Sequence, residues 1–267
     1  MPNLVSIIMP VYNAEQYVAE AIDSVLAQQH DYWELLIVND GSTDRSDEII
    51  RGYTDARIQY FKQDNAGVSV ARNVAMQAMK GDYFCFLDGD DQLTVSSLSS
   101  RLEVFAQNSK LSFVDGAVSN RTEDLSKETS QWMPNFKGEP LSDLISLSGK
   151  SFFGVTWMIK RAPNYNYAFD PSFTHGEDLW FYIQQAKNHQ YSFTSEVIYL
   201  RRISAGSAMS NLHGLANGYL SLEAKLSQLD IPPCLLSAYR AKRKSIMFKS
   251  YLRAGKVLSA FNYYFKT

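Results

Sequence analysis

Short apolar runs alternate with helical patterns along the first hundred residues of the chain. Apolar runs at positions 4–9, 33–38, 57–61 and 83–87 predict strands, the last of them apolar throughout, as expected of a strand covered on both faces. The segments between them repeat apolar residues at helical spacing, and Asn13 is the expected N-cap of the first helix. This alternation predicts parallel strands that are joined by right-handed crossovers.

The pattern is less regular up to about residue 210 and purely helical beyond it. We expect strands at 111–118, 153–159 and 191–200, a helix at 177–188, and a polar, mobile connection at 119–137. After residue 211 the strand signals stop, and the spacing predicts two or three helices. The chain is therefore expected to be an α/β protein with a mainly parallel central sheet and added C-terminal helices.

Composition narrows the class of protein. The 267 residues are 45% hydrophobic and 20% charged, with a formal net charge of -2. These values fit a folded globular protein and exclude a coiled coil, a low-complexity chain and a whole-chain nucleic-acid binder. Cys85 and Cys234 are too few for a disulfide framework, so we expect a reduced, cytoplasmic protein. The apolar runs are far shorter than the ~20 residues of a membrane-spanning helix.

Charge is distributed unevenly along the chain. Residues 1–210 contain 17 Lys and Arg against 26 Asp and Glu, whereas residues 211–267 contain 9 basic and 2 acidic residues. Basic and apolar residues are interleaved in 240–256. This mixture predicts either peripheral contact with an anionic membrane or a helical cap that packs on the rest of the chain or on a second subunit. The aromatic residues that follow are interpreted as core or dimer packing: Phe261, Tyr263, Tyr264 and Phe265.

Polar and acidic residues follow three of the predicted strands. The strand ends are Pro10-Val11-Tyr12-Asn13, Asn39-Asp40-Gly41-Ser42 and Asp88-Gly89-Asp90-Asp91. In parallel sheets ligands gather outside the carboxyl ends of the strands. Three carboxylates within one turn of chain are costly unless a cation neutralises them, and such oxygen ligands suit Mg²⁺ or Mn²⁺. The alternative is a polar turn that precedes a helix near Thr94.

Five short motifs occur in one order along the chain. They are Met9-Pro10-Val11-Tyr12-Asn13, Val38-Asn39-Asp40-Gly41-Ser42-Thr43-Asp44, Asn65-Ala66-Gly67-Val68-Ser69-Val70-Ala71-Arg72-Asn73, Phe86-Leu87-Asp88-Gly89-Asp90-Asp91 and Gly176-Glu177-Asp178. Each motif is weak alone, whereas five in order are highly specific. Together they closely resemble the family 2 glycosyltransferases with the GT-A fold, strongly across residues 1–100 and patchily to about 210.

The resemblance implies a nucleotide site at the ends of the first strands. Pro10, Val11 and Tyr12 match the segment that lines the nucleotide, largely through its backbone. Asp40 matches the aspartate that reads the base, where a carboxylate can accept the uracil N3–H. Arg72 matches an arginine near the base and the phosphates. From the residues alone, Asp40 also fits a tight turn and Arg72 a solvated charge.

The resemblance also implies a metal and a general base. Asp88, Gly89 and Asp90 match the D-x-D motif, whose first aspartate meets ribose or metal and whose second binds Mn²⁺ or Mg²⁺. Asp178 matches the base that takes the proton of the acceptor hydroxyl. The alternative for Asp178 is a favourable charge at a helix start.

Four further residues are candidate contacts to the diphosphate or the acceptor: Glu177, Arg201, Arg202 and His175. The family often has a histidine shortly after the base that can join the metal. Here the corresponding stretch, residues 199–207, departs from that pattern and has no histidine, so the resemblance leaves the fourth metal contact open.

The implied activity is an inverting, non-processive hexosyl transfer. A sugar would move from a nucleotide-sugar, with UDP as the expected nucleotide, to a hydroxyl of a saccharide or lipid-linked saccharide in bacterial surface-polysaccharide assembly. Residues 1–100 would bind the donor, 101–210 the acceptor, and 211–267 would form a basic helical segment at the inner face of the cell membrane or in a homo-oligomer. The processive signature Q-x-x-R-W is absent from the sequence. Alternatives are a nucleotidyltransferase and an inactive nucleotide-sugar binding module.

Overall fold

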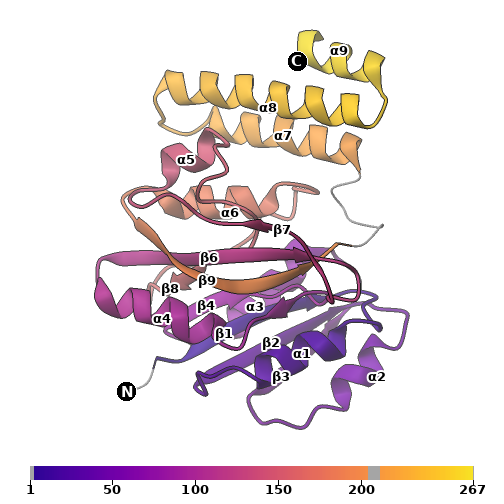
Figure 1. Cartoon of the computed structure of the whole chain (residues 1–267), viewed down its shortest axis with the longest axis vertical. Helices are drawn as coiled ribbons and strands as arrows, with labels where there is room; N and C mark the ends of the chain where they lie inside the picture. Colours follow the sequence, from indigo (N-terminus) through magenta and orange to yellow (C-terminus); the bar gives the residue numbers. More distant parts are fainter. Residues whose placement is uncertain (1–2, 204–210, 267) are drawn as a thin grey trace.

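The computed structural model describes residues 3–203 and 211–266 and contains one curled mixed sheet with helices on both faces (Figure 1). The strands are β1 (Val5–Val11), β2 (Trp33–Asp40), β3 (Ile58–Gln63), β4 (Tyr83–Phe86), β5 (Gln92–Leu93), β6 (Leu111–Arg121), β7 (Glu128–Trp132), β8 (Met158–Lys160) and β9 (Gln190–Arg202). The helices are α1 (Val18–Leu26), α2 (Ser46–Arg51), α3 (Val68–Ala78), α4 (Ser97–Gln107), α5 (Leu141–Ile145), α6 (Glu177–Ala186), α7 (Leu212–Leu226), α8 (Pro233–Arg253) and α9 (Val257–Lys266).

The N-terminal half of the sheet is parallel, as predicted. Its strand order is β3-β2-β1-β4, and every neighbouring pair is parallel. β1 and β2 are buried along their whole length, which is typical of parallel strands that helices cover on both faces. The carboxyl ends of β1, β2 and β4 therefore meet at one edge of the sheet.

The second half of the sheet mixes strand directions. β8 is antiparallel to both β4 and β6, whereas β6 is parallel to β9 over most of its length. β5 and β7 are antiparallel additions to β9 and β6. Because β8 pairs with β4, the segment that precedes β8 lies next to the acidic turn at residues 88–91.

Two hydrophobic clusters fill the two faces of the sheet. Ile7 faces a cluster with side chains of α1 and α4, and Ile8 faces a second cluster with side chains of α3 and α6. Successive residues of a strand point to opposite faces, so β1 alone contributes to both clusters. The GT-A type α/β architecture that the sequence predicts is thus present.

The C-terminal helices extend the second cluster. Leu222, Leu226 and Tyr239 of α7 and α8 belong to it, and α9 packs on these helices through a smaller cluster that includes Met247 and Tyr263. Figure 1 shows α7, α8 and α9 stacked at the end of the molecule away from β1–β3. The prediction of two or three helices after residue 211 is confirmed. Over the described residues, none of the helices is long and apolar enough to cross a bilayer.

The prediction for the first helix start is wrong. α1 begins at Val18 without a side-chain cap. Asn13 instead has a left-handed backbone conformation with φ 48°, and its side-chain oxygen accepts a hydrogen bond of 2.8 Å from the backbone N–H of Thr43. Asparagine tolerates this conformation better than most residues. Asn13 therefore joins the ends of β1 and β2 instead of capping a helix.

Two predictions for the middle of the chain also need correction. The polar stretch 119–137, which was predicted to be a mobile connection, contains the end of β6 and all of β7, and these two strands form a hairpin. Its side chains are polar because β7 is exposed to solvent. The strand expected at 153–159 is limited to Met158–Lys160, since the residues before it line a cavity in irregular conformation. Neither difference is visible in local apolar periodicity.

Candidate active site

The acidic turn after β4 lies against the end of β1. A Cβ atom placed on Gly89 would lie 3.1 Å from Cγ2 of Val11 and 3.3 Å from the carbonyl oxygen of Pro10. A residue with a side chain would therefore push the turn away from β1. The predicted nucleotide segment and the predicted metal motif are thus adjacent, and they can lie this close because Gly89 has no side chain.

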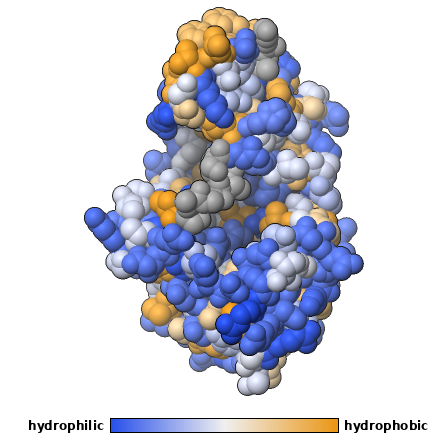
Figure 2. All heavy atoms as spheres, turned by 90° about the vertical axis from the view of Figure 1, so that its right-hand side faces the viewer, coloured by the Kyte–Doolittle hydropathy of each residue, from blue (hydrophilic) through white to orange (hydrophobic). Residues whose placement is uncertain are grey.

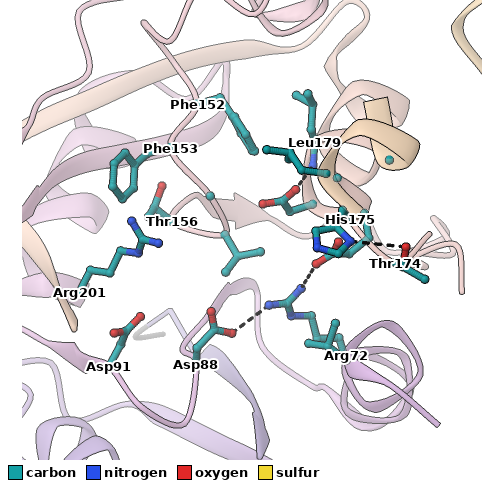
Figure 3. A pocket seen from close by; sticks show the side chains of 18 of the residues that line it. Arg72, Asp88, Asp91, Phe152, Phe153, Thr156, Thr174, His175, Leu179 and Arg201 are labelled. Atoms are coloured by element: carbon teal, nitrogen blue, oxygen red, sulfur yellow. Dashed lines mark hydrogen bonds and ion pairs between the residues drawn. The ribbon is translucent and has the colours of Figure 1, made fainter. Parts of the chain in front are cut away.

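A cavity of about 520 Å³ opens above this turn (Figure 3). One wall carries Asp88, Asp90 and Asp91, and the opposite wall carries Glu177 and Asp178 at the start of α6. The remaining lining residues come from α3, the segment between α5 and β8, the segment before α6 and α6 itself, the end of β9 and helix α7: Val68, Arg72, Phe152, Phe153, Gly154, Val155, Thr156, Thr174, His175, Gly176, Leu179, Tyr199, Arg201, Arg202, Leu215, Gly218, Tyr219 and Leu222. The structure therefore brings four of the five sequence motifs to one hollow or its floor.

Arg72 connects the two acidic walls. Its Nη2 lies 2.9 Å from Oδ1 of Asp88, and its Nη1 lies 3.4 Å from Oε1 of Glu177, as the dashed lines of Figure 3 show. The side chain is only 4% exposed, and its guanidinium lies 5.1 Å from the ring centre of Phe169. Burial lowers the pKa of Arg72, but Asp88 and Glu177 outweigh it and hold that pKa above its usual value. Arg72 is therefore a buried cation of the site, and the solvated-charge alternative does not apply.

The acidic turn concentrates negative charge. Removal of water around its carboxyl group and the neighbouring charge of Asp88 raise the pKa of Asp90. Burial, followed by the charges of Asp90 and Asp88, raises the pKa of Asp91 still further. The carboxyl of Asp91 is anchored by the backbone N–H of Arg202 at 2.7 Å and by the hydroxyl of Tyr199. Asp91 thus ties the turn to the end of β9, and Asp88, Asp90 and Asp91 all line the cavity.

The two arginines at the end of β9 have different surroundings. Nε of Arg202 donates to the carbonyl oxygen of Asp90 at 2.7 Å, and its other nitrogens bond to Glu20 and to the carbonyl oxygen of Glu123. Arg201 lies over the ring of Phe153 at 5.4 Å and forms no ion pair with any residue that the structure describes. Of the two candidates for a diphosphate contact, Arg201 is therefore the better placed. Residues 204–207 of the stretch without histidine lie outside the described residues.

Glu177 and Asp178 open helix α6. Gly176 before them has φ 80°, a left-handed conformation that suits glycine and turns the chain into the helix. Burial in the cavity wall, followed by the charge of Glu177, raises the pKa of Asp178 to about 7. One carboxylate oxygen of Asp178 accepts a hydrogen bond of 2.7 Å from the backbone N–H of Leu179, and the other accepts none from the described residues. A carboxylate with this pKa is suited to accept a proton near neutral pH.

His175 is held in the cavity wall by α7. A Cβ atom on Gly214 would lie 2.3 Å from Cε1 of His175, and one on Gly218 would lie 2.4 Å from its carbonyl oxygen. Nε2 of His175 is buried and has no hydrogen-bond partner in the described parts of the chain. The two glycines therefore allow the segment that carries His175 and Asp178 to press against α7.

Asp40 lies at the end of β2 and outside the cavity lining. Its carboxylate accepts the backbone N–H groups of Ala66 and Gly67, both at 2.8 Å, and the side-chain amide of Gln63 at 2.7 Å. These bonds fix the loop that leads into α3. Tyr12 is 54% exposed at the neighbouring strand end, so its ring is accessible to a ligand.

The roof of the cavity was not predicted from the sequence. Leu215, Tyr219 and Leu222 of α7 line it, as do Phe152 and Phe153. The pair Gly214 and Gly218 at helical spacing was a usable signal, since two glycines on one helix face permit a close approach. The lining phenylalanines had no distinguishing pattern.

The acidic turn fits a divalent cation that arrives with a phosphate ligand. Among the described residues, no three His, Cys, Asp or Glu side chains form a group that can hold a metal by themselves. The carboxylate of Asp90, however, accepts no hydrogen bond from another described side chain, and burial and the charge of Asp88 raise its pKa although Arg201 and Arg202 act in the opposite direction. Mg²⁺ is typically held by one or two carboxylates together with substrate phosphates. Asp90 and Asp88 supply such a set.

Comparison of the sequence with known proteins gives matches to glycosyltransferases. Residues 6–167 match the model of glycosyl transferase family 2. The chain is similar to the uncharacterized glycosyltransferase EpsJ of Bacillus subtilis, with 45% identity over 42% of this chain and 33% of that protein. It is also similar to the putative teichuronic acid biosynthesis glycosyltransferase TuaG of B. subtilis, with 41% identity over 40% of this chain. The matches span 33% to 43% of these relatives' lengths.

Comparison of the fold extends the similarity to nearly the whole chain. The crystal structure of S. aureus TarS 1–349 in complex with UDP-GlcNAc superposes with a TM-score of 0.76 over 97% of this chain and 78% of that one, at 18% identity. The mannosyltransferase PcManGT of Pyrobaculum calidifontis, in complex with GDP-Man and Mn²⁺, superposes with a TM-score of 0.67 over 95% of this chain and 76% of that one, at 16% identity. These similarities establish the fold alone.

Proposed function

The chain belongs to glycosyl transferase family 2, and from this premise we propose that it transfers one hexosyl group from a nucleotide-sugar to a hydroxyl group with inversion at the anomeric carbon. The observation that carries the proposal is the cavity with Asp88 and Asp90 on one wall and Asp178 on the other. Inverting transfer is a single displacement, so it needs a base on the acceptor side and charge stabilisation on the leaving-group side. The two walls supply these two functions.

Asp178 is the proposed general base. An acceptor hydroxyl is a weak nucleophile until a base within hydrogen-bond reach takes its proton. One oxygen of the Asp178 carboxylate is held by the backbone N–H of Leu179, which leaves the second oxygen for the acceptor. Glu177 is directed to Arg72 instead, so it is less suited to this role.

Asp88 and Asp90 form the proposed donor end. They would hold Mn²⁺ or Mg²⁺, which would supply charge stabilisation for the departing diphosphate. Arg72 now pairs with Asp88, and it would pair with the diphosphate instead when Asp88 binds the metal ion. Arg201 extends into the same cavity and would contact the diphosphate.

The nucleotide is proposed to lie over the ends of β1 and β2. Pro10 and Val11 support the acidic turn, and the exposed ring of Tyr12 lies at the same edge. Asp40 would act here through the loop that it organises and through its remaining lone pairs. UDP is the proposed nucleotide because the resemblance assigns to Asp40 a hydrogen bond from the N3–H of uracil. The complex of TarS with UDP-GlcNAc supports this choice of nucleotide.

The acceptor is proposed to be a saccharide or a lipid-linked saccharide. The wall on this side contains Phe152, Phe153 and Tyr219, and aromatic faces of this kind stack on sugar rings. The similarity to TuaG, which is named for teichuronic acid biosynthesis, supports a place in surface-polysaccharide assembly at the inner face of the cell membrane. The transfer is proposed to be non-processive, so that one sugar is added each time an acceptor binds.

The test is a screen of nucleotide-sugars for protection against thermal unfolding, with and without Mn²⁺, followed by product analysis. A donor that binds raises the unfolding midpoint by mass action. We expect a UDP-sugar to do so only with Mn²⁺, and NMR of the product on an alkyl glycoside acceptor to show the opposite anomeric configuration to the donor. A product of retained configuration would contradict the single displacement.

The same assays separate the two alternatives. A nucleotidyltransferase would form a nucleotide-sugar and pyrophosphate from a nucleoside triphosphate and a sugar phosphate. An inactive binding module would be stabilised by the donor but would neither transfer nor hydrolyse it. Either result would replace the proposed function.

A further inference from the structure

Helix α9 presents apolar side chains to solvent. Leu258 and Phe265 are 82% and 74% exposed, and Phe261 between them is also exposed. The opposite side of the helix is packed, since Ala260 and Tyr263 are buried in the small cluster against α7 and α8. The helix is therefore apolar on both sides, and the side with Leu258 and Phe265 is left largely open to solvent.

The exposed apolar surface continues onto the end of α8. Leu252 and Val257 are exposed beside it, and the ring of Phe248 lies edge-on to those of Phe261 and Tyr264 at 5.4 and 5.5 Å. We call this set of residues the α9 surface: Leu252, Val257, Leu258, Phe261, Tyr264 and Phe265. Figure 2 shows hydrophobic residues gathered at the end of the molecule where α9 lies.

Basic residues border the α9 surface. Lys249 follows Phe248 directly, Lys256 directly precedes α9, and both side chains are exposed. Neither forms an ion pair with a described residue, whereas Arg240 and Arg243 on α8 are paired with Glu223. The sequence has no acidic residue after Asp230, so nothing in this part of the chain offsets the positive charge.

The charge decides between the partners that such a surface can take. A second copy of the chain in a two-fold dimer would bring the same basic residues together from both sides, which is unfavourable. A bilayer with anionic headgroups accepts apolar side chains and attracts lysines at the same time. We propose that the α9 surface, with Lys249 and Lys256, binds the surface of an anionic lipid bilayer, with α9 lying in the plane of the membrane.

This binding site is separate from the cavity and does not depend on the proposed transfer reaction. The α9 surface shares no residue with the cavity lining. A helix in this position would hold the molecule at the membrane by its C-terminal end. Failure of membrane binding would therefore leave the proposed function standing, and the reverse also holds.

The test is flotation of the full chain with vesicles of phosphatidylcholine alone and of phosphatidylcholine with 30% phosphatidylglycerol. The first variant, Lys249→Gln with Lys256→Gln, should bind the anionic vesicles about 10- to 30-fold more weakly. The second, Leu258→Ser with Phe265→Ser, should bind them at least about 10-fold more weakly. The control is Lys110→Gln with Lys127→Gln, which removes two exposed lysines from the other half of the chain and should bind as the parent does.

Binding of the parent should fall with added salt and should be weak on neutral vesicles. All three variants change exposed residues, so their unfolding midpoints should match that of the parent. Equal binding by the parent and both α9-surface variants would overturn the proposal. Absence of binding between the parent and anionic vesicles would also overturn it. If the parent instead forms a dimer that the double variant Leu258→Ser with Phe265→Ser dissociates, the α9 surface is a dimer interface.

Discussion

Single charged side chains determine what the cavity can accept. Asp88, Asp90 and Asp178 project negative charge into it, and the buried cation that touches both acidic walls is Arg72. A diphosphate would add further negative charge. The site therefore needs an additional cation on ligand binding, and the side chain with the fewest competing partners near the turn is Asp90.

We expect Asp90→Ala to abolish the Mn²⁺ dependence of UDP binding and to weaken that binding by at least about 10-fold. Loss of a carboxylate that faces other carboxylates relieves repulsion, so the free energy of unfolding without metal should not fall. Isothermal titration with UDP, with and without Mn²⁺, measures the first effect. Glu103→Ala removes an exposed carboxylate of α4, outside the cavity lining, and serves as the control. Mn²⁺-stimulated UDP binding by Asp90→Ala would remove Asp90 from the metal site.

For Asp178→Asn we expect nearly normal donor binding and a turnover rate about 10²- to 10⁴-fold lower, because the amide keeps the shape and loses the base. The pKa of Asp178 is raised to about 7, and a base acts only when it is deprotonated. Turnover of the parent should therefore fall about tenfold for each pH unit below 7, and that limb should disappear in the variant. Rates at saturating donor from pH 5.5 to 8.5 measure both effects.

Glu177→Gln provides a contrasting variant. The negative charge of Glu177 contributes to the raised pKa of Asp178, so its removal should move the acidic limb of the rate profile to lower pH. Turnover at pH 8 should be reduced much less than in Asp178→Asn. If instead Glu177→Gln loses as much activity as is expected of Asp178→Asn and its acidic limb disappears, Glu177 is the base.

At the level of helices and strands, the close contact between α7 and the segment before α6 positions Asp178, the proposed base. The segment before α6 runs directly beneath α7, and its approach depends on Gly214 and Gly218. The carbonyl oxygen of His175 would lie 2.4 Å from a Cβ atom on Gly218, closer than real contacts allow. A change on α7 is therefore transmitted to the position of Asp178.

Gly218→Ala should accordingly lower the free energy of unfolding by about 1–3 kcal/mol and reduce turnover, because the His175 segment has to move. Donor binding, which depends on the other wall, should change little. Ser221→Ala alters an exposed position on the same helix and should behave as the parent does in both assays. Thermal unfolding and transfer rates measure the two effects, and unchanged turnover in Gly218→Ala would separate α7 from the base.

The elements that the sequence predicts well are those with a local signal. β1 and β2 are mainly apolar and β4 is apolar throughout, and the acidic turn shortly after Phe86 indicates where β4 ends. β7 has exposed polar side chains and exists because it pairs with β6, so its local pattern resembles a loop. The same distinction holds for the site. Asp88 and Asp90 stand in a recognisable motif, whereas Tyr219 reaches the cavity only through the packing of α7.

At the level of the whole molecule, the C-terminal helices are part of the main core. Tyr239 of α8 is fully buried in the cluster that also contains Phe84 and Phe181 of the central part. Its hydroxyl donates a hydrogen bond of 2.8 Å to the carbonyl oxygen of Tyr219. Residues 1–210 and 211–267 therefore differ in charge and yet share one hydrophobic interior, and α7 closes the cavity.

We expect Tyr239→Ala to cost about 3–5 kcal/mol of the free energy of unfolding, as for other buried aromatic side chains. The loss should appear as one cooperative transition of the whole chain, since the side chain belongs to the common core. Phe265→Ala, at an exposed position of α9, should cost less than about 0.5 kcal/mol. Denaturant unfolding followed by fluorescence and by circular dichroism checks both, and a separate early transition for the helices would contradict a shared core.

The division of the cavity into two walls has a consequence for how such enzymes diversify. The carboxylates of the acidic turn, on the proposed donor side, follow a strand in the first hundred residues, whereas the proposed acceptor side comes from the start of α6, an irregular segment around Phe153 and α7. Irregular segments and helix surfaces accept substitutions more readily than buried parallel strands. A lineage can therefore acquire a new acceptor by changing one wall while its donor chemistry is inherited unchanged. We expect relatives that share a donor and differ in acceptor to diverge first around Phe153 and along α7.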